Sequence, residues 1–160
     1  MNAKGKKLGF AMCGSFCTFS HCFDVLEILI KSGWEIIPIM SYNAYSIDTR
    51  FGKAADHIKR LESMCGREVI HTIDGAEPIG PKNMTDVMLV ANCTGNTLAK
   101  LAMSITDTAV IVKRKTMPCH NMKITESHCL TAAGFMFICY LEIWIALNAE
   151  KAVNVSVSLS

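Results

Sequence analysis

The sequence predicts an α/β fold, a parallel sheet with flanking helices. Short apolar runs alternate with amphipathic stretches over residues 8–102, which is typical of alternating strands and helices. The run at 86–91 is almost continuously apolar, as in parallel strands that are covered on both faces. With 160 residues, the chain can bury the core of one domain and is too short for two of comfortable size.

The first expected unit is a strand, a helix and a second parallel strand. An apolar strand at 8–13 ends at Gly14 and Ser15, and an amphipathic helix follows at 24–32, closed by Gly33. The link to a second strand at 34–40 is short, which favours a parallel pair. Pro38 argues against a central position for this second strand, because proline has no N–H to donate.

The rest of the predicted domain continues the alternation. Turn formers dominate 74–81, so this segment is expected to be a loop. The expected elements are a polar loop at 41–46, a helix at 53–64, a short strand at 69–73, the loop at 74–81, a strand at 86–91, and a helix that starts after 94–97.

Three of these loops follow strands, and ligands of open α/β sheets bind beyond the carboxyl ends of the strands. Backbone N–H groups, small hydroxyl residues and helix N-termini together favour an anion, and phosphate is the natural guest. The candidate binding residues on these loops are Gly14, Ser15, Thr18, Ser41, Thr94, Gly95, Asn96 and Thr97. Asp48 and Arg50 lie in a loop expected on the same rim, where arginine can bind a carboxylate through two hydrogen bonds.

Each candidate has an alternative interpretation. A Gly-Ser turn after a strand is common in any α/β protein, and Asn96 or Thr97 can serve as a helix cap. Lys100 can steady an anion or simply be solvated. His57 is interpreted as a surface residue of its helix, and His71 as a strand residue facing solvent. The chain contains neither the dinucleotide-binding glycine motif nor a P-loop.

Charge and cysteine content argue against several classes of partner and site. A net charge of +2 gives no basic stripe, so we expect no nucleic-acid partner. The spacing of Cys13, Cys17 and Cys22 lacks the paired CxxC of a zinc site, so we expect no metal and interpret the thiols as buried and reduced. The absence of a signal peptide favours a cytoplasmic setting.

Four stretches carry a resemblance to a known family: 5–18, 48–54, 75–82 and 94–102. Over about residues 5–110 the chain resembles the dipicolinate synthase B subunits, small flavoproteins of spore-forming bacteria that are related to flavin-containing cysteine decarboxylases. The resemblance implies a flavodoxin-like, Rossmann-like sheet. It also implies FMN binding, with Gly14, Ser15 and Thr18 on the phosphate side and Ser41 and 94–97 nearer the flavin.

The resemblance further implies a partner and a reaction. The partner would be an NADPH-dependent A subunit, and the product would be dipicolinate, made from the dicarboxylate dihydrodipicolinate during sporulation. Asp48 and Arg50 would contact the substrate or another subunit, and the chain would form a homo-oligomer in the mother-cell cytoplasm. The alternatives are an FMN-dependent decarboxylase of the same family and a non-catalytic partner subunit.

The sequence departs from the family at two places. Asn92 stands where relatives usually have a proline, and the expected pattern disappears after about Val110. We therefore divide the chain into a flavoprotein-like domain at 1–112 and an atypical apolar tail at 113–160, for which a frameshifted gene end is the preferred explanation. The run at 129–147 approaches the length of a membrane span, but Glu142 would be costly in lipid, so we expect no membrane association.

Overall fold

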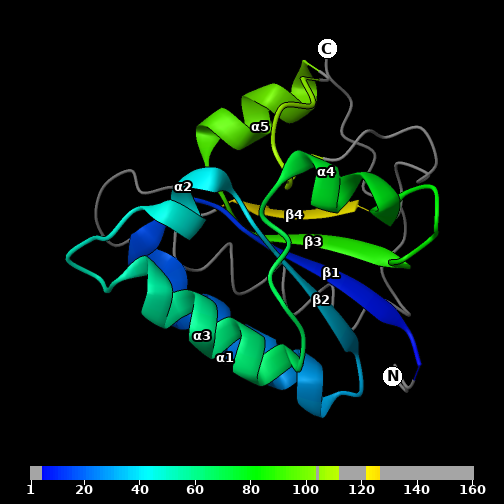
Figure 1. Cartoon of the computed structure of the whole chain (residues 1–160), viewed down its shortest axis with the longest axis horizontal. Coiled ribbons are helices and arrows are strands. Elements are labelled where there is room, and N and C mark those ends of the chain that lie inside the picture. Colours follow the sequence, from blue (N-terminus) through cyan, green and yellow to red (C-terminus); the bar gives the residue numbers. More distant parts are fainter. Residues whose placement is uncertain (1–4, 104, 112–121, 127–160) are drawn as a thin grey trace.

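In the computed structural model, residues 5–103, 105–111 and 122–126 are described. Four parallel strands form one sheet in the order β2-β1-β3-β4 (Figure 1). The strands are β1 (Lys7–Met12), β2 (Glu35–Met40), β3 (Val87–Cys93) and β4 (Met122–Glu126). The α/β prediction is therefore confirmed, and β1 lies at the centre between β2 and β3.

Alternation along β1 divides the core into two layers. Leu8, Phe10 and Met12 pack on one face of the sheet, and Ala11 packs on the other. Gly9 leaves room for the neighbouring strand, because a Cβ atom there would lie 2.7 Å from the sulfur of Met88 on β3. The strand is therefore buried on both faces, as expected for the middle of a parallel sheet.

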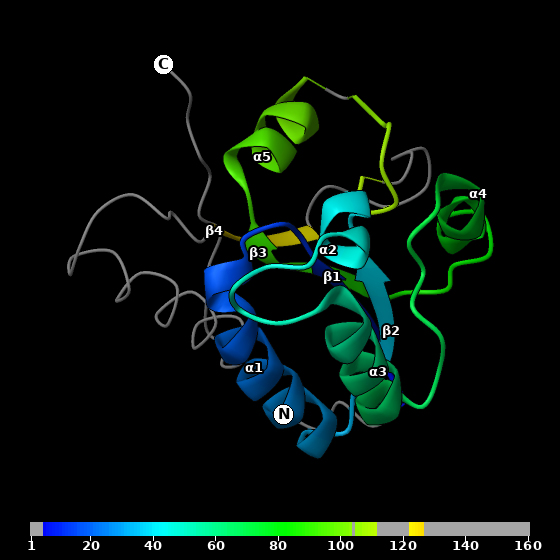
Figure 2. The same cartoon turned by 60° about the vertical axis from the view of Figure 1, so that its left-hand side comes forward.

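The first layer is formed by α1 (Phe19–Lys31) and α3 (Ala54–Cys65), which lie side by side along one face (Figures 1 and 2). Helix α1 supplies most of this layer, because its apolar residues recur at helical spacing: Phe19, Cys22, Phe23, Leu26 and Leu29 are all buried. From α3, Leu61 is fully buried. Gly66 ends α3 in the left-handed conformation, with φ of 68°.

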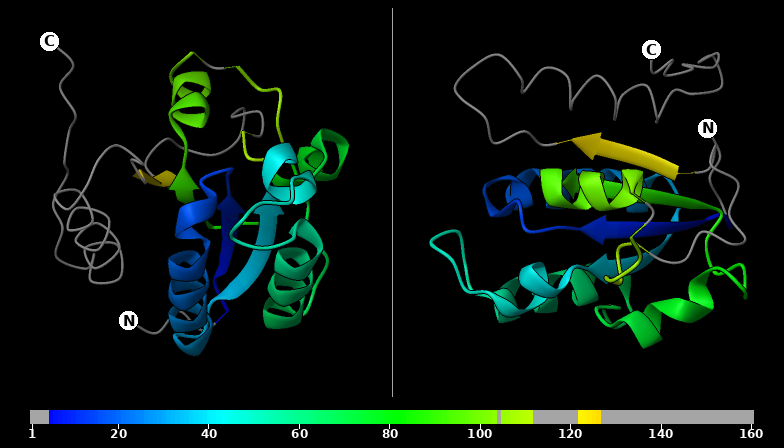
Figure 3. Two further views of the ribbon diagram at one scale, coloured as in Figure 1. Left: turned by 90° about the vertical axis from the view of Figure 1, so that its left-hand side faces the viewer. Right: turned by 90° about the horizontal axis from the view of Figure 1, so that it is seen from above.

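The second layer covers the opposite face of the sheet. It contains α4 (Ile73–Ala76), the 3-10 turn η2 (Glu77–Ile79) and the buried segment 109–111. Leu98 and Leu101 of α5 (Gly95–Ala102) pack against the same cluster. The left view of Figure 3 shows α5 and α4 apart from the α1 and α3 layer.

Several predicted boundaries were wrong. Helix α1 begins at Phe19 rather than at 24, since η1 (Phe16–Thr18) leads directly into it. The segment predicted as a polar loop at 41–46 contains α2 (Tyr42–Ser46), because Ser41 accepts a hydrogen bond from the N–H of Ala44 as an N-cap. The expected loop at 74–81 instead contains most of α4 and η2, and Thr72 caps α4 in the same way.

The predicted strand at 69–73 is only a single bridge, between Ile39 and Ile70. This bridge explains how Pro38 fits into the sheet. The Pro38 carbonyl accepts a hydrogen bond from the N–H of Ile70, on the side of β2 away from β1. Because the nitrogen and the carbonyl of a strand residue face the same side, the Pro38 nitrogen also faces away from β1, and no hydrogen bond to β1 is lost. The edge position suggested by the proline is thus correct.

Strand β4 lies within the segment that the sequence analysis set apart as an atypical tail. It pairs in parallel with β3, with Met122 opposite Met88 and a register irregularity between Val90 and Cys93. The apolar run at 129–147 lies outside the described residues. Within the described ranges, no helix is both long and apolar enough to span a membrane.

Candidate functional site

The carboxyl ends of β1, β2 and β3 bring three loops together at one edge of the sheet. The N–H of Ser41, after β2, donates to the carbonyl of Met12 at the end of β1, at 2.9 Å. A Cβ atom on Gly14 would lie 3.6 Å from the Cβ of Asn43, which is ordinary van der Waals contact. The structure therefore brings the loops after β1 and β2 together, as the sequence predicted.

Asn92 joins the loops after β1 and β3. Its side chain is fully buried; Oδ1 accepts from the N–H of Cys13 at 2.6 Å, and Nδ2 donates to the carbonyl of Cys13 at 2.9 Å. The same Nδ2 donates to the carbonyl of Ser15 at 3.3 Å. No role for this residue was predicted from the sequence. The signal was present, because an asparagine in a buried apolar strand needs partners for its amide.

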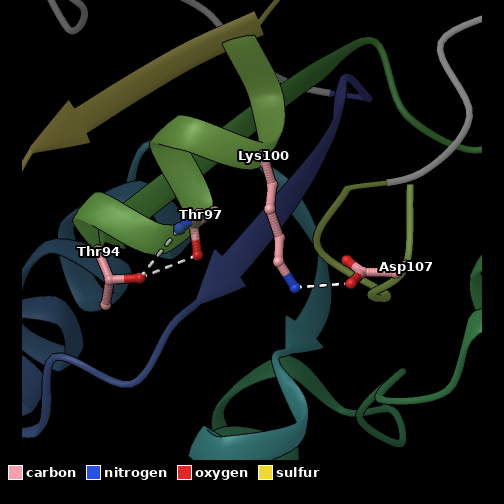
Figure 4. Close-up of polar contacts among 4 residues, drawn as sticks. All are labelled: Thr94, Thr97, Lys100 and Asp107. Carbon is pink, nitrogen blue, oxygen red and sulfur yellow. Dashed lines mark hydrogen bonds and ion pairs between the residues drawn. The ribbon is translucent and has the colours of Figure 1, made fainter. Parts of the chain in front are cut away.

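The N-terminus of α5 is held by two threonines. The Thr94 hydroxyl accepts from the N–H of Thr97 at 3.3 Å and lies 3.0 Å from the Thr97 hydroxyl (Figure 4). Thr97 in turn donates to the sulfur of Cys13 at 3.5 Å. The cap predicted as the alternative for this loop does exist, but Thr94 forms it rather than Asn96 or Thr97.

Gly95 and Asn96 are the exposed members of this loop. Being the first two residues of α5, they carry N–H groups with no acceptor in the preceding turn, and none of the hydrogen bonds among the described residues uses them. A Cβ atom on Gly95 would meet nothing within 4 Å. At the start of α5, the available N–H donors and the open space are therefore at these two residues.

In the loop after β1, the polar groups mostly serve the loop itself. The Thr18 hydroxyl donates to the carbonyl of Ser15 at 2.8 Å, and the Ser15 hydroxyl lies 3.9 Å from the sulfur of Cys17. Ser15 is 8% exposed. The N–H of Gly14 has no hydrogen-bond partner among the described residues. This loop thus offers backbone donors more readily than free hydroxyls.

Asp48 and Arg50 lie in the loop between α2 and α3. The Asp48 carboxylate accepts from the N–H of Ala54 at 2.8 Å, so it orders the start of α3. Arg50 is exposed, with its guanidinium 4.8 Å from the centre of the Phe51 ring. Of the two predicted contact residues, Arg50 is the one whose charge is available to a ligand or partner.

Lys100 is directed to a carboxylate. Its Nζ lies 2.7 Å from Oδ2 of Asp107, and Figure 4 shows the side chain leaving α5 toward the segment that holds this aspartate. An anion-binding role and simple solvation were the alternatives in the sequence analysis. The structure gives a third result, an intramolecular ion pair.

Two histidines are less exposed than predicted. His57 packs edge-on against Phe19, with ring centroids 4.9 Å apart, and its Nε2 is buried without a hydrogen-bond partner among the described residues. His71 is not in a strand and stacks on Tyr45 at 3.5 Å between ring centroids. Aromatic contacts that form only in the folded chain account for both differences.

The cysteines of the described segments form no disulfide with one another: Cys13, Cys17, Cys22, Cys65 and Cys93. Burial raises the pKa of the Cys13 thiol, although the hydrogen bond from Thr97 acts in the opposite direction. This thiol is therefore neutral at physiological pH and behaves as a packing group. In these same segments, no three His, Cys, Asp or Glu side chains are grouped to hold a metal ion.

Comparison with known proteins agrees with this architecture. The chain is 42% identical over 112 residues to the dipicolinate synthase B subunit of Bacillus subtilis (strain 168), covering 70% of this chain and 56% of that protein. The chain thus spans about half the length of this curated relative. The remaining part of the relative has no counterpart in the match.

Two solved structures share the fold. The crystal structure of the dipicolinate synthase B subunit from Bacillus halodurans C has a TM-score of 0.65 and 28% identity, covering 89% of this chain and 73% of that one. The FMN-dependent cysteine decarboxylase SpaF has a TM-score of 0.64 and 18% identity, covering 93% and 82% of the two chains. At its lower identity, the likeness to SpaF concerns the fold alone.

The model of the Flavoprotein family matches residues 1–125, which extends beyond the boundary predicted at 112 and reaches into β4. The match includes all three loops at the carboxyl edge of the sheet. With its flavodoxin-like sheet and this match over most of its length, the chain belongs to the Flavoprotein family.

Proposed function

We propose that this chain binds FMN at the rim formed by the loops after β1, β2 and β3. The observation that carries the proposal is the convergence of these loops, held together by Asn92 and by the bond from Ser41 to Met12. Membership of the Flavoprotein family and the shared fold with the FMN-dependent SpaF support a flavin. The rim provides N–H donors at one edge of a sheet.

The residues present fit a phosphorylated ligand. Gly95 has open space where a side chain would stand, and the N–H groups of Gly95 and Asn96 lie at the N-terminus of α5, where the helix dipole favours negative charge. On the phosphate side we place the backbone of Gly14 and Ser15, with Thr18 bracing the turn. Ser41, Thr94, Gly95, Asn96 and Thr97 are placed nearer the flavin, where Thr94 and Thr97 act chiefly by holding α5.

We further propose that the chain acts as the B subunit of a dipicolinate synthase, together with an NADPH-dependent A subunit. The supporting observations are the 42% identity to the Bacillus subtilis protein and the likeness to the Bacillus halodurans structure. Bound FMN would supply two-electron redox chemistry. Arg50 is exposed and is placed against the dicarboxylate or a surface of the partner, and Asp48 orders the loop that carries it.

The overall reaction is an oxidation. Dihydrodipicolinate would lose two electrons and two protons to give dipicolinate, while NADP⁺ on the A subunit would accept a hydride to become NADPH and the second proton would pass to solvent. The setting that goes with this role is a homo-oligomer in the cytoplasm of the mother cell during sporulation. The rival roles are an FMN-dependent decarboxylase and a non-catalytic subunit that positions its partner.

Reconstitution separates the three roles. The full chain, loaded with FMN, is incubated with dihydrodipicolinate and NADP⁺, with and without the A subunit, and dipicolinate is measured. The proposal predicts more product when both subunits are present than with either alone. A flavin-loaded chain that releases CO₂ from a carboxylate substrate without the A subunit would favour the decarboxylase, and stimulation without bound flavin would favour the non-catalytic role.

A further inference from the structure

The amide of Asn92 makes three of its four possible hydrogen bonds, all of them to one short segment of backbone. Its oxygen accepts from the N–H of Cys13, and its nitrogen donates to the carbonyls of Cys13 and Ser15. An asparagine amide has one acceptor oxygen and two N–H donors. Asn92 is 0% exposed, so bulk solvent does not reach these groups.

This arrangement is costly unless the contacts are retained. Burying a free amide is unfavourable, and leaving the backbone partners of Asn92 unpaired would add to that cost. The strand around it is otherwise apolar, with Val90 fully buried and Cys93 2% exposed. Packing alone would therefore favour an apolar residue, and the amide is explained by the loop that it holds.

The hydrogen bonds fix both sides of Gly14. Cys13 is held through its N–H and its carbonyl, and Ser15 is held through its carbonyl. The N–H of Gly14, between these fixed points, has no partner among the described residues. Asn92 is also two residues before Thr94, which caps α5. The end of β3 therefore both holds the loop after β1 and leads into the loop that begins α5.

We propose that Asn92 is a positioning residue for the phosphate group of the flavin: it orders the backbone at Cys13–Ser15 relative to the N-terminus of α5. This inference rests on the proposed FMN site and assigns the recognition of the phosphate, rather than of the ring, to the join between β1 and β3. Binding of the flavin ring depends on other parts of the rim. Loss of the amide therefore affects a phosphorylated flavin more than one without phosphate.

The test compares FMN with riboflavin, which has the same ring and lacks the phosphate. Dissociation constants for both are measured by quenching of flavin fluorescence with the full chain, its Asn92→Leu variant and its Asn92→Ser variant. Serine retains one hydroxyl and keeps the experiment informative if the leucine variant fails to fold. The matched control is Met88→Ala, which removes buried contacts from the same strand four residues earlier.

The expected result is that FMN affinity falls by about tenfold in Asn92→Leu and less in Asn92→Ser, as for loss of a charge-assisted contact. Riboflavin affinity stays within about twofold, and Met88→Ala leaves the preference for FMN unchanged. Equal losses of affinity for FMN and riboflavin, or an undiminished preference for FMN in both Asn92 variants, would overturn the positioning role. Either result would leave the proposed FMN site itself intact. A wild-type chain that binds neither flavin would instead remove the FMN site itself.

Discussion

The hydroxyl of Thr97 donates a hydrogen bond to the sulfur of Cys13, at 3.5 Å, across 84 positions of the sequence. It links the first turn of α5 to the residue that follows the central strand β1. The same hydroxyl lies 3.0 Å from that of Thr94, so cap and strand end form one connected group. The rim is therefore a structural unit as well as a candidate binding surface.

Replacing Thr97 by valine tests this connection. Valine has a similar shape without the hydroxyl, so the variant loses the bond to Cys13 and the contact with Thr94. We expect the free energy of unfolding to fall by about 0.5–1.5 kcal/mol. Urea denaturation measures the change, with Ser32→Ala as the control, because the Ser32 hydroxyl makes an exposed bond within its own helix. No difference between the two variants would contradict the connection.

Asn96→Ala tests the ligand role of the α5 N-terminus. The Asn96 side chain is exposed and makes no hydrogen bond within the described residues, so its loss costs the fold little. If the amide contacts the flavin ring of FMN, affinity should fall by about three- to tenfold, as for loss of a hydrogen bond between neutral groups. Met103→Ala, at an exposed position after the other end of α5, is the control. Unchanged FMN affinity in Asn96→Ala would remove this residue from the site.

Much of the fold follows from apolar periodicity, and the misses have physical causes. Strands β1, β2 and β3 were predicted nearly in place, because residues buried on both faces of a sheet are apolar throughout. Helix α1 was predicted to start too late, since its first turn contains Ser20 and His21 among apolar residues. Helix α4 contains a glycine and an aspartate, whose local preference for turns is overcome by packing of Ala76.

The candidate site shows the same division. Gathering the three loops at one edge required only the parallel order of the strands, and that part was predictable. The partners of Asn92 and Lys100 were not, because Cys13 is 79 positions from Asn92 and Asp107 lies in an irregular segment. Hydrogen bonds between distant segments depend on exact register, which a hydrophobic pattern does not contain.

Two glycines allow a paired test of backbone strain and steric contact. Gly52 has φ of 139°, and a Cβ atom there would lie 2.6 Å from Nε2 of His57. Gly66 has φ of 68° with nothing within 4 Å, so alanine there meets backbone strain alone, about 1 kcal/mol. We expect Gly52→Ala to lower the unfolding free energy more than Gly66→Ala in thermal or urea denaturation. The reverse order would show that His57 does not occupy this contact.

The stability of the chain should decline at alkaline pH. Burial raises the pKa of Cys65 from 9.0 to about 12, and burial also raises the pKa of Cys13. Between about pH 9 and pH 12 the unfolded chain therefore releases a Cys65 proton that the folded chain retains, so unfolding becomes more favourable as pH rises. Below pH 9 both states keep the proton and this contribution is fully present.

Urea denaturation at a series of pH values under reducing conditions measures this effect. Cys65→Ala should show a shallower fall of the unfolding free energy above pH 9 than the wild-type chain. Cys17→Ala, at an exposed position, serves as the control for removing a thiol. Identical slopes for the wild-type chain and Cys65→Ala would contradict the assignment to Cys65.

The Lys100–Asp107 pair predicts a small, salt-dependent coupling. The two side chains are 24% and 51% exposed, so solvent screens much of their attraction. A double-mutant cycle with Lys100→Met and Asp107→Asn should give a coupling of about 0.2–1 kcal/mol that decreases in high salt. A coupling of zero at low salt would contradict a stabilising contribution from this pair.

The most direct measurement of the central claim is flavin retention by the full-length chain. The protein is incubated with excess FMN, separated from free ligand by gel filtration, and its absorbance spectrum is recorded. The account predicts a yellow protein with about one FMN per chain, and a lower FMN content for Asn96→Ala. A folded protein that elutes colourless after incubation would contradict it.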